Sequence, residues 1–221
     1  MVNKIDTHEK LFKEWRERYN NSLKAYDFVE DGIIDPTRWE KSPCKTLFIL
    51  KESYHGSGAK GDWDMRRGLL ETHKGPFGQT FWKAAYLSYT LLQLIQNKIP
   101  NFPDKKEVIE PFLSSAIINI KKPVGNKLSD IKDLNEIARQ DSDLIKRQIE
   151  LIKPKIILCG GTWEVINENK IIENYKKVSR RVFKARNLII FHFWHPGVPA
   201  PAEVLQDTLC WIVMKSKVFG I

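Results

Sequence analysis

The chain has 221 residues, 42% of them hydrophobic and 11% aromatic, a composition that excludes a disordered protein and suits one or two globular domains. No apolar run approaches the ~20 residues that a membrane-spanning helix needs, and the charged N-terminus lacks the apolar centre of a signal peptide, so we expect a cytoplasmic protein with no membrane partner. The net charge of +9 favours a polyanionic partner such as nucleic acid, although the basic residues that gather in Lys170–Arg186 also suit a solvated surface.

Helical and strand-like segments alternate along the chain. Hydrophobic periodicity predicts helices over residues 7–30, 80–97, 105–113, 133–152 and 201–214, with a short one after Thr162, and buried strands over residues 46–50, 115–120, 155–159 and 188–193. The helices are long enough to cross over between parallel strands, and the glycine-rich residues 56–78 read as one long loop. The pattern predicts an α/β fold in which a parallel four-stranded sheet carries helices on both faces. We expect a single domain spanning residues 1–221, with residues 1–45 as a helical segment packed on it.

Chemically useful side chains follow three of the four predicted strands. Glu52 and Tyr54 come directly after the first strand, Asn119 lies near the end of the second, and His195 follows the fourth. Ligands bind outside the carboxyl ends of parallel strands, so we expect these side chains to meet. A carboxylate that orients water, an amide that reads a base edge and an imidazole that donates to a leaving base suit hydrolysis of an N-glycosidic bond.

Other kinds of site find less support in the residues. Cys44, Cys159 and Cys210 are far apart and have neither disulfide nor metal-ligand spacing, and the sequence contains no phosphate-binding glycine loop of the nucleotide-hydrolase kind. Ser53 and His55 are too close in sequence to be read as a nucleophile and its base. We therefore expect the protein to use no metal and no cofactor.

Five segments, taken in chain order, resemble the motifs of the uracil-DNA glycosylase superfamily. They are L-K-E-S-Y-H-G at residues 50–56, P-F-G at 76–78, I-N-I-K-K-P-V-G-N-K at 118–127, R-Q-I-E-L-I-K-P-K-I-I-L-C-G-G at 147–161 and W-H-P-G at 194–197. The resemblance implies a uracil-DNA glycosylase-like fold, a three-layer α/β/α sandwich with a central four-stranded parallel sheet. It also implies a DNA glycosylase, which hydrolyses the N-glycosidic bond of uracil or of another deaminated or modified base and leaves an abasic site.

The resemblance gives the motif residues roles in base excision. The target nucleotide must leave the base stack, because its glycosidic carbon is out of reach inside a duplex. Glu52 and His195 would be the catalytic residues, the first activating water and the second donating to the base oxygen. Asn119 would recognise the base, Phe77 would stack on it and Tyr54 would crowd its C5 position. No lysine falls on a motif position, so we expect a monofunctional glycosylase without lyase activity.

DNA, single- or double-stranded, is the partner that the resemblance implies. Lys121, Lys122 and Lys127 would hold phosphates, which would make the affinity salt-dependent. Val198 and Pro199, after the His-Pro step, would wedge into the gap that the flipped nucleotide leaves. We expect the protein to act as a monomer.

The chain also departs from the best-known branch of that superfamily. Ser53 stands where that branch has proline, Leu50 where it has glycine, and Gly197 where it has serine. These departures leave the excised base and the strand preference open. Two other functions remain open as well: a catalytically silent nucleic-acid-binding module, and a hydrolase of free nucleotides or nucleosides with the same fold.

Overall fold

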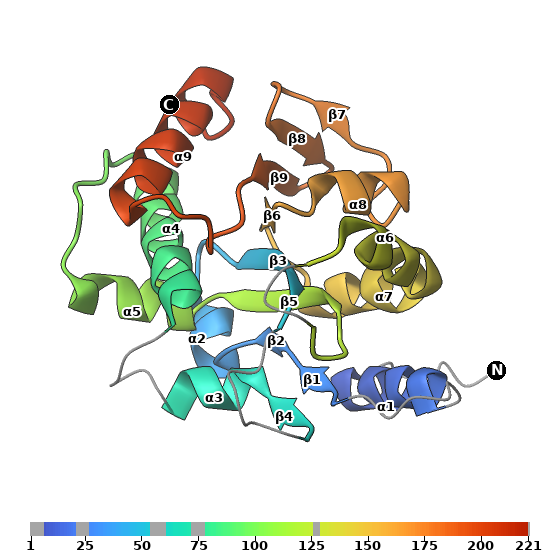
Figure 1. Ribbon diagram of the computed structural model, residues 1–221. Helices are drawn as coiled ribbons and strands as arrows, with labels where there is room; N and C mark the ends of the chain where they lie inside the picture. Colours follow the sequence, from blue (N-terminus) through green and yellow to red (C-terminus); the bar gives the residue numbers. More distant parts are fainter. Residues whose placement is uncertain (1–6, 21–26, 54–60, 72–77, 126–128, 221) are drawn as a thin grey trace.

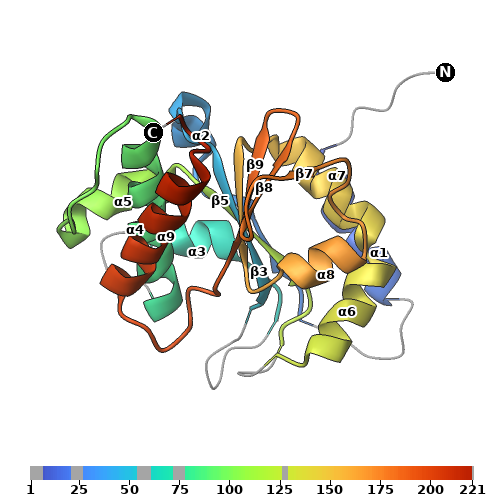
Figure 2. The same cartoon turned by 90° about the horizontal axis from the view of Figure 1, so that it is seen from above.

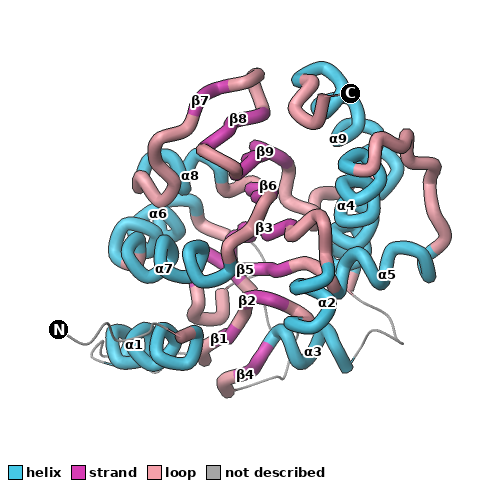
Figure 3. Tube along the Cα trace, turned by 180° about the vertical axis from the view of Figure 1, so that it is seen from behind, coloured by secondary structure: helices cyan, strands magenta, loops and turns pink. Residues whose placement is uncertain are grey.

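The fold is built on a seven-stranded mixed sheet. In the computed structural model, which describes residues 7–20, 27–53, 61–71, 78–125 and 129–220, the strand order is β2-β5-β3-β6-β9-β8-β7 (Figures 1 and 3). The strands are β2 (Gly32–Ile33), β5 (Ala116–Lys121), β3 (Thr46–Glu52), β6 (Ile156–Gly160), β9 (Leu188–Phe193), β8 (Val182–Ala185) and β7 (Lys176–Lys177). The four central strands β5, β3, β6 and β9 are parallel, and β2, β8 and β7 extend the sheet in antiparallel pairs.

Helices cover both faces of this sheet, as Figure 2 shows. One face carries α2 (Pro36–Lys41), α3 (Met65–Glu71), α4 (Gln79–Ile95), α5 (Lys105–Leu113) and α9 (Ala202–Ser216). The other carries α1 (His8–Asn20), α6 (Ile131–Gln140), α7 (Ser142–Ile152) and α8 (Trp163–Glu168). A two-stranded ladder, β1 (Val29–Glu30) with β4 (Trp63–Asp64), lies beside them. None of the helices in these ranges is long and apolar enough to cross a membrane.

The central strands are apolar because both of their faces are buried. In β3, Phe48 and Leu50 face the core under α4 and α9, whereas Leu47 and Ile49 face the core under α6 and α7. Parallel strands between two helical layers read as continuous hydrophobic runs for this reason. The predicted parallel sheet with helices on both faces is therefore confirmed, although it is the centre of a larger mixed sheet.

Other predicted boundaries were wrong. The helix expected over residues 7–30 ends at Asn20, and residues 28–33 instead form a bridge and two short strands. The helix expected over residues 133–152 is two helices that break at Asp141, whose buried carboxylate accepts hydrogen bonds from Trp15 Nε1 (2.9 Å) and Tyr19 Oη (2.7 Å). The described part of the expected loop 56–78 contains β4 and α3.

Candidate active site

A cavity of about 710 Å³ lies at the carboxyl ends of the parallel strands. Glu52 from the end of β3, Asn119 from β5 and His195 after β9 all line it, so the three residues that the sequence selected meet in one place. The other lining residues are Leu50, Lys51, Ser53, Trp63, Met65, Gly78, Thr80, Phe81, Ser129, Gly197 and Val198. A volume of this size suits a small organic ligand such as a nucleobase with its sugar.

The carboxylate of Glu52 is held in a confined position. Its side chain is only 5% exposed, and Oε2 lies 3.2 Å from Nζ of Lys121, the residue opposite it in the β3–β5 register. Gly125 covers the carboxylate on another side, and its amide donates to the carbonyl of Ser53 (2.8 Å). A Cβ at residue 125 would lie 2.0 Å from Oε2, so glycine there leaves the space that the carboxylate occupies.

Asn119 reaches the cavity from a buried polar network. Its side-chain Nδ2 donates to Ser53 Oγ (3.0 Å), and its backbone amide donates to Asp31 Oδ2 (2.8 Å). The other oxygen of Asp31 accepts from Lys122 Nζ (2.6 Å) and from Gln148 Nε2 (2.9 Å). These bonds fix the end of β5 and meet the polar groups that would otherwise be costly to bury.

His195 is a neutral hydrogen-bond donor. Burial, together with the nearby charge of Lys51, lowers the pKa of the imidazole from 6.5 to about 4. Nδ1 accepts a hydrogen bond from the backbone amide of Gly197 (3.0 Å), which puts the ring proton on Nε2. Nε2 has no partner among the described residues and is therefore available to a ligand in the cavity.

Two glycines bring β6 close to His195. Gly161 adopts a left-handed conformation (φ 67°), in which its amide donates to the carbonyl of Phe193 (2.8 Å). A Cβ at Gly160 would lie 2.7 Å from Leu50 Cδ2 and 3.5 Å from the backbone of His195. The Gly160–Gly161 turn thus permits the close approach of strand and loop that packs His195 at the cavity.

The structure corrects the assignment of Lys122 to DNA binding. Its side chain is fully buried, and Nζ donates to Asp31 Oδ1 (2.6 Å), to the carbonyl of Asn119 (2.9 Å) and to Gln148 Oε1 (2.8 Å). Nζ also lies 4.7 Å from the ring centroid of Trp15. A lysine in these surroundings cannot reach a phosphate at the surface.

Lys121 also differs from the prediction, because its ammonium group is bound by two carboxylates, those of Glu52 and Asp133 (2.6 Å). Burial lowers the pKa of Lys121, but the hydrogen bond to Asp133 and the charge of Glu52 outweigh this effect and leave the pKa raised. Its contacts make it a partner of Glu52 rather than an open phosphate contact.

The structure does not test the roles predicted for the remaining site residues. Val198 lines the cavity, and its carbonyl accepts a hydrogen bond from Lys83 Nζ (2.6 Å), so its insertion into DNA stays a prediction. Tyr54, Phe77 and Lys127 lie outside the described residues.

Sequence reasoning missed much of the cavity wall. Trp63 and Met65 reach it from β4 and α3, and Thr80 and Phe81 from the start of α4. No sequence pattern marked these residues as neighbours of Glu52. Trp63 and Met65 lie in a stretch read as one long loop, and Thr80 and Phe81 begin a predicted helix whose apolar side chains suit the core. Lys51 and Ser53 flank Glu52 and could have been included by their position alone.

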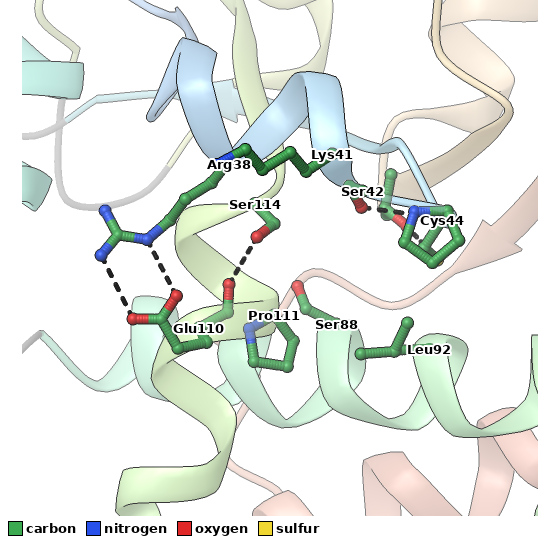
Figure 4. Close-up of a pocket in the computed structure, with 11 residues that line it drawn as sticks. Arg38, Lys41, Ser42, Cys44, Ser88, Leu92, Glu110, Pro111 and Ser114 are labelled. Atoms are coloured by element: carbon green, nitrogen blue, oxygen red, sulfur yellow. Dashed lines mark hydrogen bonds and ion pairs between the residues drawn. The ribbon is translucent and has the colours of Figure 1, made fainter.

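A second cavity, of about 270 Å³, lies between α2, α4 and α5 at the opposite end of β3 (Figure 4). Some of its polar side chains are bonded within the lining: Arg38 Nε donates to Glu110 Oε2 (2.8 Å), and Ser114 Oγ donates to the Glu110 carbonyl (2.8 Å). Burial raises the pKa of the Cys44 thiol to about 11, which leaves it a poor nucleophile.

Within the described ranges, no three His, Cys, Asp or Glu side chains are grouped to hold a metal ion. No protein-family model matches this chain, and no curated protein sequence matches it.

Proposed function

We propose that this protein is a monofunctional DNA glycosylase, which hydrolyses the N-glycosidic bond of uracil or of another deaminated or modified base flipped out of DNA. The observation that carries the proposal is that Glu52, Asn119 and His195 line one cavity. The motif order along the sequence adds to it. We propose that the layered α/β fold, with its parallel centre, is a uracil-DNA glycosylase-like sandwich.

Asn119 and His195 recognise the base. The target nucleotide leaves the stack and its base enters the cavity. The amide of Asn119 pairs with the edge of the base, and its hydrogen bond to Ser53 Oγ fixes the orientation of the amide. His195 donates from Nε2 to a base oxygen, which stabilises the negative charge that the base acquires as its bond to the sugar breaks.

Glu52 promotes the hydrolysis of the glycosidic bond. The C1′–N bond breaks with its electron pair going to the base, and C1′ becomes cationic. The Glu52 carboxylate stabilises that cation and orients a water molecule, whose oxygen bonds to C1′ while its proton passes to Glu52. The base leaves as an anion and is protonated on release. The Lys121 ammonium and the space left by Gly125 hold the carboxylate where it must act.

Base release from a substrate panel tests this proposal. The panel contains single- and double-stranded oligonucleotides with uracil, hypoxanthine, xanthine or a modified pyrimidine, together with the corresponding free nucleosides and nucleotides. We expect the wild type to release one base from an oligonucleotide and Glu52→Gln to lose this release. Glu136→Gln, altered at an exposed acid on α6, is the control and should release the base as the wild type does. Release from free nucleotides alone would replace the glycosylase by the nucleotide hydrolase.

A further inference from the structure

A basic hairpin, residues 176–186, extends the sheet beyond β9 (Figure 1). Its cations are Lys176, Lys177, Arg180, Arg181, Lys184 and Arg186. None of them forms an ion pair with a carboxylate in the described part of the chain. Every other arginine does: Arg16, Arg18, Arg38, Arg66, Arg67, Arg139 and Arg147. The basic hairpin is therefore where uncompensated arginines gather.

The two strands of the basic hairpin place like charges opposite each other. Lys176 pairs with Lys184 in the antiparallel register of β7 and β8, and both side chains are exposed. Like charges directly across a ladder are destabilising. Lysine on an edge strand also blocks association with other sheets, and this effect accounts for the two lysines of β7. It does not account for Arg180 and Arg181, which lie in the turn before β8.

That turn adjoins the candidate active site. Val182 pairs with Phe191 near the carboxyl end of β9, and the Arg181 carbonyl accepts from the amide of His192 (2.9 Å). The guanidinium of Arg181 lies 5.3 Å from the ring centroid of Trp194, which directly precedes His195 and is 40% exposed. The basic surface thus extends from the hairpin to Trp194, the residue before His195, which lines the cavity.

Among the ion pairs of the described residues, only one involves the segment from β7 to β9. The carboxylate of Glu164 lies 3.2 Å from Nε2 of His192, and none of the hairpin cations is paired with it. The surface keeps its positive charge, with one exposed indole ring at the end nearest the cavity. Cations that follow a phosphate backbone and an aromatic ring on which a base stacks are the two elements of single-strand binding surfaces.

We propose that the basic hairpin and Trp194 bind the DNA strand on one side of the target nucleotide. Lys177, Arg180 and Arg181 contact successive phosphates, and Trp194 stacks on a neighbouring base. This inference rests on the proposed function, because it takes the cavity as the place of the flipped nucleotide. It implies a polynucleotide substrate, since a free nucleotide has no flanking phosphates for this surface to hold.

Binding of a labelled oligonucleotide at several salt concentrations tests the inference without requiring catalysis. The test variant combines Lys177→Gln, Arg180→Gln and Arg181→Gln. The control combines Lys13→Gln, Lys98→Gln and Lys106→Gln, which lowers the net charge equally at exposed positions outside the basic hairpin. We expect the test variant alone to reduce the slope of log affinity against log salt by roughly 2 to 3, since each lost phosphate contact removes about 0.7 to 0.9.

Trp194→Leu provides an independent arm. Loss of one stacked base predicts an affinity roughly 5- to 100-fold weaker, with the salt slope unchanged. Equal slopes for the two triple variants, or unchanged affinity of Trp194→Leu, would overturn the inference. Oligonucleotide binding through the basic hairpin and Trp194, with no base released, would uphold this surface as a DNA-binding surface and would count against the glycosylase. Circular dichroism verifies that each variant is folded.

Discussion

The carboxylate of Glu52 occupies the place that a side chain at residue 125 would need. A Cβ at Gly125 would lie 2.0 Å from Oε2 and 2.7 Å from Cγ of Glu52, well inside van der Waals contact. Gly125 follows β5 and comes within reach of Glu52 because its amide bonds to the carbonyl of Ser53. A residue with no side chain is thus part of how the candidate catalytic carboxylate is positioned.

Gly125→Ala should therefore impair base release. The added methyl group forces the Glu52 carboxylate out of its position, and a displacement of ~1 Å in a catalytic group can cost on the order of 100-fold in rate. Gly68→Ala, in α3, is the control, because Gly68 does not line the cavity and its Cβ would make only an ordinary contact, 3.4 Å from Trp63 Cζ3. Single-turnover release by the two variants gives the comparison. Equal rates would show that the carboxylate does not need this position.

His195 should stay neutral to unusually low pH. Burial and the charge of Lys51 lower its pKa to about 4, so NMR titration of the ring should find its midpoint there in the folded protein. Lys51→Met should raise that midpoint, because a nearby positive charge disfavours protonation. A midpoint near the ordinary 6.5 in the wild type would contradict the neutral donor role.

The same pKa shift predicts a pH-dependent stability. The unfolded chain binds a proton at His195 near pH 6.5 and the folded chain only near pH 4, so unfolded molecules hold more protons between these values. The free energy of unfolding should fall as the pH falls through that window. His195→Gln should remove this part of the dependence in chemical denaturation. Parallel curves for wild type and variant would refute it.

Lys122 should act on stability rather than on DNA binding. Lys122→Met leaves the buried carboxylate of Asp31 without its cation, and breaking a buried ion pair on one side costs about 3–5 kcal/mol. Lys132→Met, at an exposed position on α6, is the control and should cost little. Urea denaturation measures both. If Lys122→Met were fully folded, kept its stability and lost DNA affinity, that result would support the original assignment of Lys122 to a phosphate contact.

The parts that the sequence could predict depend on regular patterns. The parallel strands β3, β5, β6 and β9 are buried on both faces, so each reads as an apolar run. Because Glu52, Asn119 and His195 follow or end three of those strands, topology alone brings them to one edge. Their shared cavity is where that reasoning places a ligand.

The parts that it could not predict depend on contacts between distant residues. Lys122 sits in a basic turn by sequence, but Asp31 and Gln148, far from it along the chain, bury its ammonium. The strands β2 and β7 have two residues each, too few to show an alternation of buried and exposed side chains. Asp141 breaks a predicted helix because Trp15 and Tyr19 bind its carboxylate.

Whether Glu52 carries out the hydrolysis can be tested by comparing the wild type with a variant that lacks its charge. Single-turnover base release and binding are measured with the same oligonucleotide for the wild type and for Glu52→Gln, which keeps the shape of the side chain and removes its charge. We expect release to fall by at least ~100-fold, the lower range for a general base, while binding stays within a few-fold of the wild type. Release at the wild-type rate by a folded Glu52→Gln protein would show that Glu52 does not carry out the hydrolysis.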